Sequence, residues 1–325
     1  MRRLAPYIQI MRVDHWFKNA LVLPGVVVAY ILNGQMPQVA DLASLIPGFL
    51  AICLAASANY TINEIVDAPY DRKHPDKQDR AIPSGRVGIP SAFAQYGVLL
   101  GASLLVGYMV NVPFLCALAF FTFMGLVYNV PPVRTKDITY VDTLTEAINN
   151  PTRLALGWWM VDALTWPPLS LIVAYWMLGA FLMALKRYAE YRHIASVTDA
   201  EQATRYRASF AHTDDVRLLV SAVLYVNAFH LLLGVFIAKF HVELILAIPF
   251  ISLVAAYYLR IALRPESVAQ SPEKLYRERK LMVMFVVASI VTLGALLADI
   301  PTLDDWLRMQ KPISPPKLES TDTGQ

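Results

Sequence analysis

Two carboxylates and one amide follow one another at four-residue intervals in a charged stretch between two apolar segments. Asn63, Asp67 and Asp71 are each close to one helical turn apart, so a helix would bring their side chains onto one face. Mg²⁺ takes oxygen ligands, commonly one or two carboxylates together with substrate phosphates. The spacing therefore predicts that Asp67 and Asp71 bind Mg²⁺, with Asn63 as a neutral ligand. Pro69 lacks a helical N–H group, which places Asp71 just beyond the helix, in the loop.

Cations follow these carboxylates. Lys77 and Arg80 lie nearest the acidic face, and Lys73 and Arg86 flank them. Carboxylates for a metal followed by cations for phosphate are the composition of a diphosphate site, so we predict that Lys77 and Arg80 bind phosphate. Two simpler interpretations stay open. Acidic residues also cap the ends of membrane spans, and cations collect in cytoplasmic loops whatever their chemistry.

A second acidic group lies inside a later apolar segment. Asp142, Glu146, Asn149 or Asn150, and Arg153 follow helical spacing, which predicts that they line one face of a helix. Ionisable residues inside a membrane usually face the bundle interior or a polar cavity and mark function. We predict that Asp142 and Glu146 are catalytic and that Asn150 and Arg153 bind substrate. The alternative is a structural pair between Arg153 and Glu146 or Asn149.

A third candidate is the pair Lys186 and Arg187, which ends another apolar segment and is followed by Tyr188. The pair could contact phosphate, or it could anchor the segment with Tyr188 at the level of the lipid headgroups. The six histidines and two cysteines have neither metal nor disulfide spacing.

The composition identifies the elements that must position these residues. Of 325 residues, 56% are hydrophobic and 16% are charged, whereas a soluble domain carries about 25% charged residues. The chain is therefore predicted to be an all-α integral membrane protein. A span needs about 20 apolar residues, and about nine segments qualify, of which the fifth is the weakest because it holds ionisable residues. They are 19–36, 42–62, 90–110, 112–130, 140–161, 168–188, 216–238, 242–263 and 281–299.

The loops between these segments alternate in Lys and Arg content. The N-terminal segment and the even loops are rich in cations, and the odd loops hold only Lys239. This asymmetry predicts a cytoplasmic N-terminus and places every charged cluster on the cytoplasmic side. No removable signal peptide is predicted. Residues 1–307 are predicted to form one transmembrane domain and 308–325 a disordered tail. The net charge of +3 indicates no nucleic-acid partner.

With these residues in view, the chain resembles the UbiA superfamily of membrane prenyltransferases over roughly residues 5–300. The acidic stretch from Asn63 to Asp71 is similar to the family's first motif, and Asp142-x-x-x-Glu146 stands where the second motif is expected. Glu64 departs from the Asp that the family more often has. The resemblance implies nine helices around a cavity open to the cytoplasm, where Mg²⁺ binds the diphosphate of a donor.

Two further stretches resemble one branch, the polyprenyl-phosphate (decaprenyl-phosphate) phosphoribosyltransferases. They are Arg12-x-x-x-Trp16-x-Lys18-Asn19 and the segment that starts at Lys186-Arg187. This branch implies transfer of a 5-phosphoribosyl group to a polyprenyl phosphate in a bacterial inner membrane, for cell-envelope precursor synthesis. The substrate-binding residues would then be Lys18, Asn63, Lys77, Arg80, Tyr128, Asn150, Arg153, Lys186 and Arg187.

Other stretches resemble true prenyltransferases. Two stretches look more like those of enzymes that move a prenyl group to a lipid or aromatic acceptor. They are residues 81–86, and Tyr128 followed by Pro131-Pro132 and Lys136. An isoprenoid lipid, a diphosphate-bearing donor and membrane lipid are the expected partners in either case. A polytopic transporter is the alternative of another class, disfavoured because the acidic groups lie at one face beside basic loops. The oligomeric state is left open by the sequence.

Overall fold

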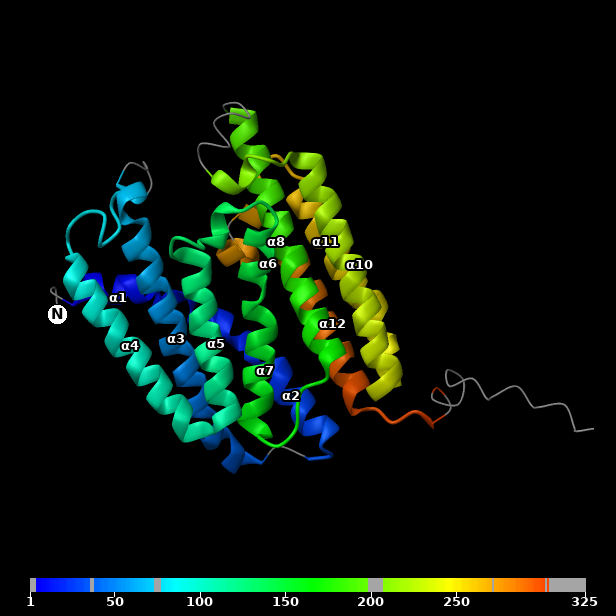
Figure 1. The fold of residues 1–325 in the computed structure, drawn as a ribbon. Coiled ribbons are helices and arrows are strands. Elements are labelled where there is room, and N and C mark those ends of the chain that lie inside the picture. Colours follow the sequence, from blue (N-terminus) through cyan, green and yellow to red (C-terminus); the bar gives the residue numbers. More distant parts are fainter. Residues whose placement is uncertain are drawn as a thin grey trace, which may run out of the picture.

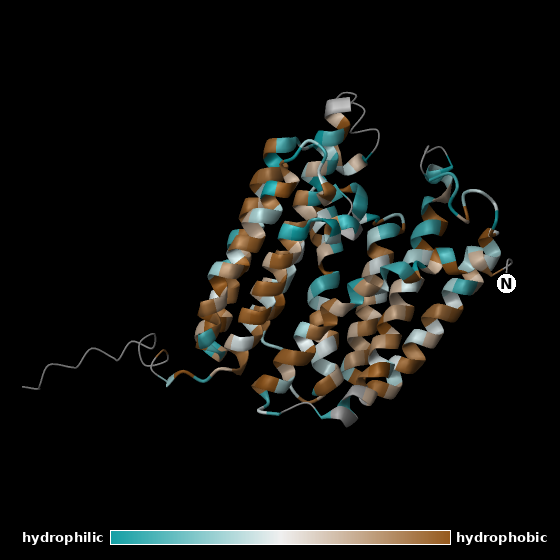
Figure 2. Ribbon diagram, turned by 180° about the vertical axis from the view of Figure 1, so that it is seen from behind, coloured by the Kyte–Doolittle hydropathy of each residue, from teal (hydrophilic) through white to brown (hydrophobic). Residues whose placement is uncertain are grey.

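The chain folds into a bundle of helices that run alongside one another (Figure 1). The structure is a computed structural model that describes residues 4–35, 38–72, 77–197, 207–270, 272–301 and 303. Within these ranges every regular element is a helix. Figure 2 shows hydrophobic residues along the bundle and hydrophilic residues gathered at the end where α3 (Val39–Asp71) and α8 (Leu169–Val197) finish. We call this end the charged end. The predicted tail, 308–325, lies outside the described residues.

The long helices agree with most of the predicted spans. Within the described ranges, eight helical segments are long and apolar enough to cross a membrane. The N-terminal one combines α1 (Ala5–Met11), η1 (Val13–Val22) and α2 (Leu23–Leu32). The others are built from α3 (Val39–Asp71), α4 (Ile89–Val110), α5 (Val112–Asn129), α8 (Leu169–Val197), α10 (Asp215–Phe240), η4 (Val242–Ala247) with α11 (Ile248–Ala262), and α12 (Arg279–Leu297). Shorter elements in the loops are η2 (Thr135–Asp137), η3 (Ala208–Phe210), η5 (Val268–Gln270) and η6 (Pro272–Arg277).

The fifth predicted span, 140–161, is not one helix. It is divided into α6 (Val141–Ala147) and α7 (Asn149–Val161), with a turn at Ile148. Pro151 has no N–H group to donate to the carbonyl of Ala147, so the helical hydrogen-bond ladder is interrupted there. The residues from Asp142 to Arg153 are therefore carried by two helices, although Ile148 between them keeps a right-handed helical backbone.

Helix α3 reaches further toward the charged end than predicted. It runs through Pro69 and ends at Asp71, and Arg72 N donates to Ala68 O over 3.1 Å. Pro69 lies in the last turn, where the loss of one N–H donor is tolerated because the next turn is closed by Arg72. The expectation that Asp71 lies beyond the helix was wrong, and Asn63, Asp67 and Asp71 follow one another on a single helix.

Glycines allow α7 to lie directly against the N-terminal segment. A Cβ on Gly25 of α2 would overlap Leu154 O of α7, and a Cβ on Gly157 of α7 would overlap Val22 O of η1. Two helices can approach this closely only where side chains are absent. The contact holds η1, α2 and α7 in fixed register, which positions the polar residues at the top of α7.

Candidate active site

The first charged cluster forms around Asp67 where α3 meets the loop after α5. Asp67 Oδ1 accepts from Lys136 Nζ over 2.5 Å and from Arg134 Nη2 over 3.1 Å. One helical turn lower, Asn63 Nδ2 donates to Asn129 Oδ1, and Lys136 Nζ reaches the same oxygen over 3.3 Å. Burial lowers the pKa of Lys136, and Asp67 opposes that shift. The cluster joins α3 to the start of η2.

Arg134 occupies a backbone conformation that side-chain-bearing residues rarely adopt. Its φ is +30°, in the left-handed region. The guanidinium is held on every side: Nε donates to Asp137 over 2.7 Å, Nη1 donates to Asn129 O over 3.1 Å, and the group lies 5.1 Å from the centre of the Tyr70 ring. Strained residues of this kind cluster at functional sites, where surrounding contacts compensate for the strain. The contacts fix Arg134 beside Asp67.

Asp71 pairs with the loop that follows α3. Its Oδ2 accepts from Arg80 Nη1 over 2.7 Å. Glu64, which is buried, accepts the backbone N–H of Ile82 over 3.1 Å and so ties the same loop to α3. Lys77 is partly buried nearby, and burial lowers its pKa while the charge of Asp71 raises it. The two predicted phosphate ligands, Lys77 and Arg80, thus lie beside Asp71.

The donor set at Asp67 and Asp71 fits a metal that shares its ligands with a substrate. In the described part of the chain no three His, Cys, Asp or Glu residues converge. Each of the two aspartates has one oxygen bound to cations, and the second oxygens, Asp67 Oδ2 and Asp71 Oδ1, accept no hydrogen bond there. Mg²⁺ is typically held by one or two carboxylates plus substrate phosphates. Asp67, Asp71 and the Asn63 amide suit that arrangement.

A second charged cluster centres on Arg187 of α8. Its Nε donates to Asp142 Oδ2 over 2.9 Å, Nη2 donates to Glu146 Oε2 over 2.9 Å, and Nη1 donates to Glu190 Oε2 over 3.3 Å. Tyr128 OH also donates to Glu146 Oε2 over 2.8 Å. Four residues predicted from the sequence, Tyr128, Asp142, Glu146 and Arg187, therefore meet. Every guanidinium nitrogen of Arg187 is bound to a carboxylate.

Arg207 and Ser209 complete this cluster from η3 and the residue before it. Arg207 Nη2 and Ser209 Oγ each lie 3.2 Å from Asp142 Oδ2. Lys186, beside Arg187 in sequence, makes no hydrogen bond or ion pair within the ranges the structure covers, and its charge acts on Glu146 and Glu190. The neighbouring cations are therefore different: Arg187 is fully engaged, and Lys186 is available to a ligand.

Arg153 lies apart from both clusters. It is 8% exposed; its Nε donates to Asn19 Oδ1 over 3.1 Å and its Nη1 to Asn149 O over 3.3 Å. The guanidinium also lies 5.0 Å from the centre of the Phe121 ring. The alternative of a pair with Glu146 was wrong, because Glu146 is bound to Arg187, although the Asn149 backbone does contact Arg153.

Two predicted substrate ligands lie outside these networks. Asn150 packs against α8, since a Cβ added to Gly179 would overlap its amide nitrogen. Lys18 lies on η1 and is partly buried. Neither is brought into contact with Asp67 or Asp142 by any hydrogen bond or ion pair described here. The proposed role of Lys18 rests on the resemblance and that of Asn150 on its place in the second acidic segment.

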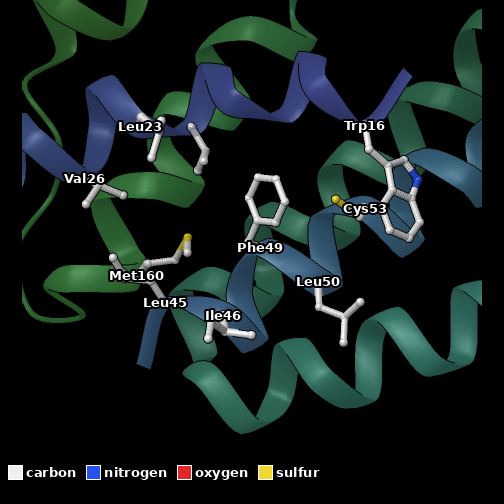
Figure 3. Close-up of a pocket in the computed structure, with 10 residues that line it drawn as sticks. Trp16, Leu23, Val26, Leu45, Ile46, Phe49, Leu50, Cys53 and Met160 are labelled. Atoms are coloured by element: carbon white, nitrogen blue, oxygen red, sulfur yellow. The ribbon is translucent and has the colours of Figure 1, made fainter. Parts of the chain in front are cut away.

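An apolar groove runs beside this polar region (Figure 3). It has a volume of about 400 Å³ and lies between the N-terminal segment and α3, with Met160 of α7 at its back. Its lining is Trp16, Val22, Leu23, Val26, Leu45, Ile46, Phe49, Leu50, Cys53 and Met160. Several of these side chains are well exposed, among them Ile46 at 65%. The groove is therefore open at the surface that the membrane would cover.

Sequence reasoning did not assign several residues that the structure brings to the site. They are Asn19, Asn129, Arg134, Lys136, Glu190, Arg207 and Ser209. The loop that contains Arg134 and Lys136 was recognisable as basic, and that signal could have found them. Arg207 lies 65 positions from Asp142, so no spacing in the sequence indicates that pair.

The chain is similar to several known proteins. The family model described as the UbiA prenyltransferase family matches residues 21–286. The chain is 34% identical over 122 residues to the decaprenyl-phosphate phosphoribosyltransferase of Mycolicibacterium smegmatis, covering 37% of this chain and 38% of the relative. It is 31% identical over 204 residues to the protein of that name from Mycobacterium tuberculosis, covering 61% of this chain and 63% of the relative.

The fold has close counterparts among solved structures. A UbiA homolog from Archaeoglobus fulgidus bound to GPP and Mg²⁺ superposes with a TM-score of 0.62 at 17% identity, covering 90% of this chain and 100% of that one. At this identity the likeness concerns the fold. The two curated relatives are matched over less than two thirds of their own length, so the similarity to them does not by itself transfer their substrates.

Proposed function

Because the chain belongs to the UbiA prenyltransferase family, we propose that this membrane transferase uses Mg²⁺ to move a 5-phosphoribosyl group from phosphoribosyl diphosphate to a polyprenyl phosphate. The observation that carries the proposal is the pair of charged clusters on Asp67 and Arg187, both at the charged end. Relatives named decaprenyl-phosphate phosphoribosyltransferase support the choice of substrates. The Lys and Arg asymmetry of the loops supports a cytoplasmic site in a bacterial inner membrane.

The first cluster would bind the diphosphate of the donor. Asp67 and Asp71, with Asn63, would hold Mg²⁺ through oxygens that accept no hydrogen bond among the described residues. Arg134, Lys136 and Arg80, which pair with these aspartates, would turn toward phosphate oxygens. Bound Mg²⁺ would stabilise the negative charge that develops on the leaving diphosphate.

The reaction needs little acid–base chemistry from the protein. A phosphate oxygen of the acceptor forms a bond to C1 of the ribosyl group, and the bond from C1 to the diphosphate oxygen breaks with its electron pair leaving on diphosphate. The acceptor oxygen is already ionised, so no general base has to remove a proton. The contribution of the cations is preorganised electrostatic stabilisation of the leaving group.

The second cluster would orient the phosphoribosyl group. Arg187 orders Asp142, Glu146 and Glu190 into a fixed rim, and Lys186 offers a cation to the 5-phosphate. The Asn149 Oδ1 atom is buried and has no hydrogen-bond partner in the described chain, and an unsatisfied buried acceptor costs about 1–3 kcal/mol. A ribosyl hydroxyl can donate to it, whereas a prenyl chain has no donor.

The alternative donor is a prenyl diphosphate. It is favoured by the Archaeoglobus fulgidus homolog, whose structure holds GPP and Mg²⁺, and by the residues 81–86. In that case the same carboxylates and cations would receive the diphosphate, and Glu146 would orient a neutral acceptor. The two possibilities differ in the group transferred, not in the metal site.

A transfer assay on detergent-purified protein separates these possibilities. Labelled phosphoribosyl diphosphate is supplied with polyprenyl phosphate and Mg²⁺, and labelled prenyl diphosphates are supplied separately with lipid or aromatic acceptors. We expect lipid-extractable ribosyl label, and a loss of about 100-fold or more in Asp67→Asn. The matched control is Asp215→Asn, in the first turn of α10, where the side chain is partly buried and belongs to neither charged cluster. Prenyl transfer without ribosyl transfer would refute the proposal.

A further inference from the structure

Arg153 is a buried cation that lacks an anionic partner among the residues the structure describes. The groups its side chain bonds are neutral: the Asn19 amide and the Asn149 carbonyl. The titratable groups whose charges act on it are Tyr60, Tyr175 and Cys53. None of these is a carboxylate, and no ion pair to Arg153 occurs among the described residues. Arg187, by contrast, is equally buried but touches three carboxylates.

A buried charge without a counter-ion is costly. Isolated charges are rarely buried in proteins without a partner, since loss of hydration is not repaid by neutral hydrogen bonds alone. Guanidinium groups match phosphate particularly well, because their N–H donors can form paired bonds to two phosphate oxygens. The environment of Arg153 is therefore suited to an anion that arrives with a ligand.

The cation is linked to the apolar groove through Asn19. Asn19, whose Oδ1 binds Arg153, also donates through Nδ2 to Cys53 Sγ over 3.3 Å. Cys53 lines the groove, and Trp16 beside it is fixed by a 3.0 Å bond from Nε1 to Ser57 Oγ (Figure 3). From there the groove continues past Phe49 to Leu45. A cationic head site and an apolar channel thus follow one another, as an amphiphile with an anionic head requires.

The depth of Arg153 separates it from the surface of the bilayer. Tyr60, one of the groups near Arg153, precedes Asp67 by seven positions on α3, which corresponds to about 10 Å along the helix axis at 1.5 Å per residue. An ordinary phospholipid keeps its phosphate at the membrane surface. A phosphate at Arg153 would lie below the proposed diphosphate site.

We propose that Arg153 with Asn19 binds the phosphate of the polyprenyl phosphate acceptor and that the groove from Cys53 to Leu45 holds its isoprenoid chain. The inference rests on the proposed function for the identity of the acceptor. The groove volume of about 400 Å³ falls within the range of roughly 300–1,000 Å³ found for ligand pockets. Its apolar lining suits a hydrocarbon chain, because such a chain needs no hydrogen-bond partner.

Equilibrium binding without donor tests this assignment. Labelled polyprenyl phosphate and the polyprenol of the same chain length are each titrated onto the detergent-purified full chain. We expect Arg153→Gln to weaken binding of the phosphate by about 10-fold or more, because charged hydrogen bonds contribute about 1.5–3 kcal/mol, and to leave polyprenol binding unchanged. Arg153→Lys should restore part of the phosphate binding.

The groove is tested separately with bulky side chains. Ile46→Trp places a large ring at the mouth of the groove and should weaken binding of both lipids, while Leu105→Trp, on the exposed side of α4, should weaken neither. If the Arg153 variants do not fold, the two tryptophan variants still test the inference. Equal binding of polyprenyl phosphate by Ile46→Trp and Leu105→Trp would overturn it. Displacement of polyprenyl phosphate by an equal concentration of phosphatidate would also overturn it.

The binding and transfer assays fail in different ways. Arg153-dependent binding of polyprenyl phosphate, without any ribosyl transfer from the donor, would refute the proposed function and leave the acceptor site standing. Ribosyl transfer by a protein whose Arg153→Gln variant binds polyprenyl phosphate like the wild type would refute the acceptor site alone.

Discussion

Lys186 and Arg187 are adjacent cations of α8, and the structure gives them different surroundings. Arg187 is buried and bonds Asp142, Glu146 and Glu190, whereas Lys186 has electrostatic contacts but no ion pair within the described ranges. We therefore predict that Arg187→Met destabilises the protein and that Lys186→Met lowers transfer activity while leaving stability almost unchanged.

The size of the stability loss in Arg187→Met follows from the burial of the ion pair. The side chains of Arg187 and Asp142 are 3% and 4% exposed, and removing one partner of a buried pair costs about 3–5 kcal/mol. Arg187→Lys should recover little, since one ammonium group cannot reach three carboxylates. For comparison, Arg217 pairs with Asp214 at 63% and 47% exposure, so Arg217→Met should cost no more than about 1 kcal/mol.

Thermal unfolding in detergent at a fixed scan rate measures these differences. At roughly 2–4 °C per kcal/mol, the midpoint of Arg187→Met should fall by at least about 6 °C. Adding Glu190→Gln should return part of the loss, because one unpaired carboxylate is then neutral. The reasoning fails if Arg187→Met unfolds at the same temperature as Arg217→Met, or if the Glu190→Gln addition lowers stability further.

Three other perturbations test neighbouring parts of the site. Burial lowers the pKa of Lys77 and Lys136 below the ordinary 10.5, so activity that needs both cations should be lost on raising the pH before free lysine titrates. The double variant with arginine at both positions should raise the pH at which activity is lost. If that pH does not change, Lys77 and Lys136 are not the groups whose titration limits activity. Glu64→Leu leaves the backbone N–H of Ile82 in the 77–88 loop unpaired. It should therefore destabilise the folded loop by about 1–3 kcal/mol, which faster proteolysis of that loop would show. Gly157→Ala should lower the unfolding temperature because its Cβ overlaps a backbone oxygen of η1, whereas Gly101→Ala, with open space around it, should be neutral or stabilising; equal effects would refute the close helix contact.

Local periodicity was enough to predict the first cluster's framework. The four-residue spacing of Asn63, Asp67 and Asp71 predicts one helical face, and α3 carries all three residues. The apolar segments likewise predict most membrane helices, since the need to pair every backbone group in lipid allows few alternatives. Pro69 was given too much weight, because a proline in the last turn removes only one hydrogen bond that the following residues replace.

Contacts between distant segments could not be predicted in this way. Arg153 meets Asn19 across 134 positions, and Arg187 meets Asp142 across 45. Such pairs depend on how helices approach, which in turn depends on the glycines at 25 and 157. A helical-face argument assigned Arg153 to the acidic residues of 142–146, but Asp142 and Glu146 bond Arg187 of α8, whereas Arg153 bonds Asn19 of η1.

Charge balance implies that the two anion sites differ in their need for metal. At the first site a diphosphate would face Asp67 and Asp71, and two like charges about 4 Å apart repel by about 4 kcal/mol at an effective dielectric constant of 20. Mg²⁺ bound at Asp67 and Asp71 would offset this repulsion, so metal and donor should bind together. Arg153 faces no carboxylate in the described chain and should bind phosphate without metal. Chelation should therefore abolish binding of phosphoribosyl diphosphate and leave binding of polyprenyl phosphate unchanged; equal sensitivity of both ligands to chelator would show that Arg153 does not hold the acceptor phosphate alone.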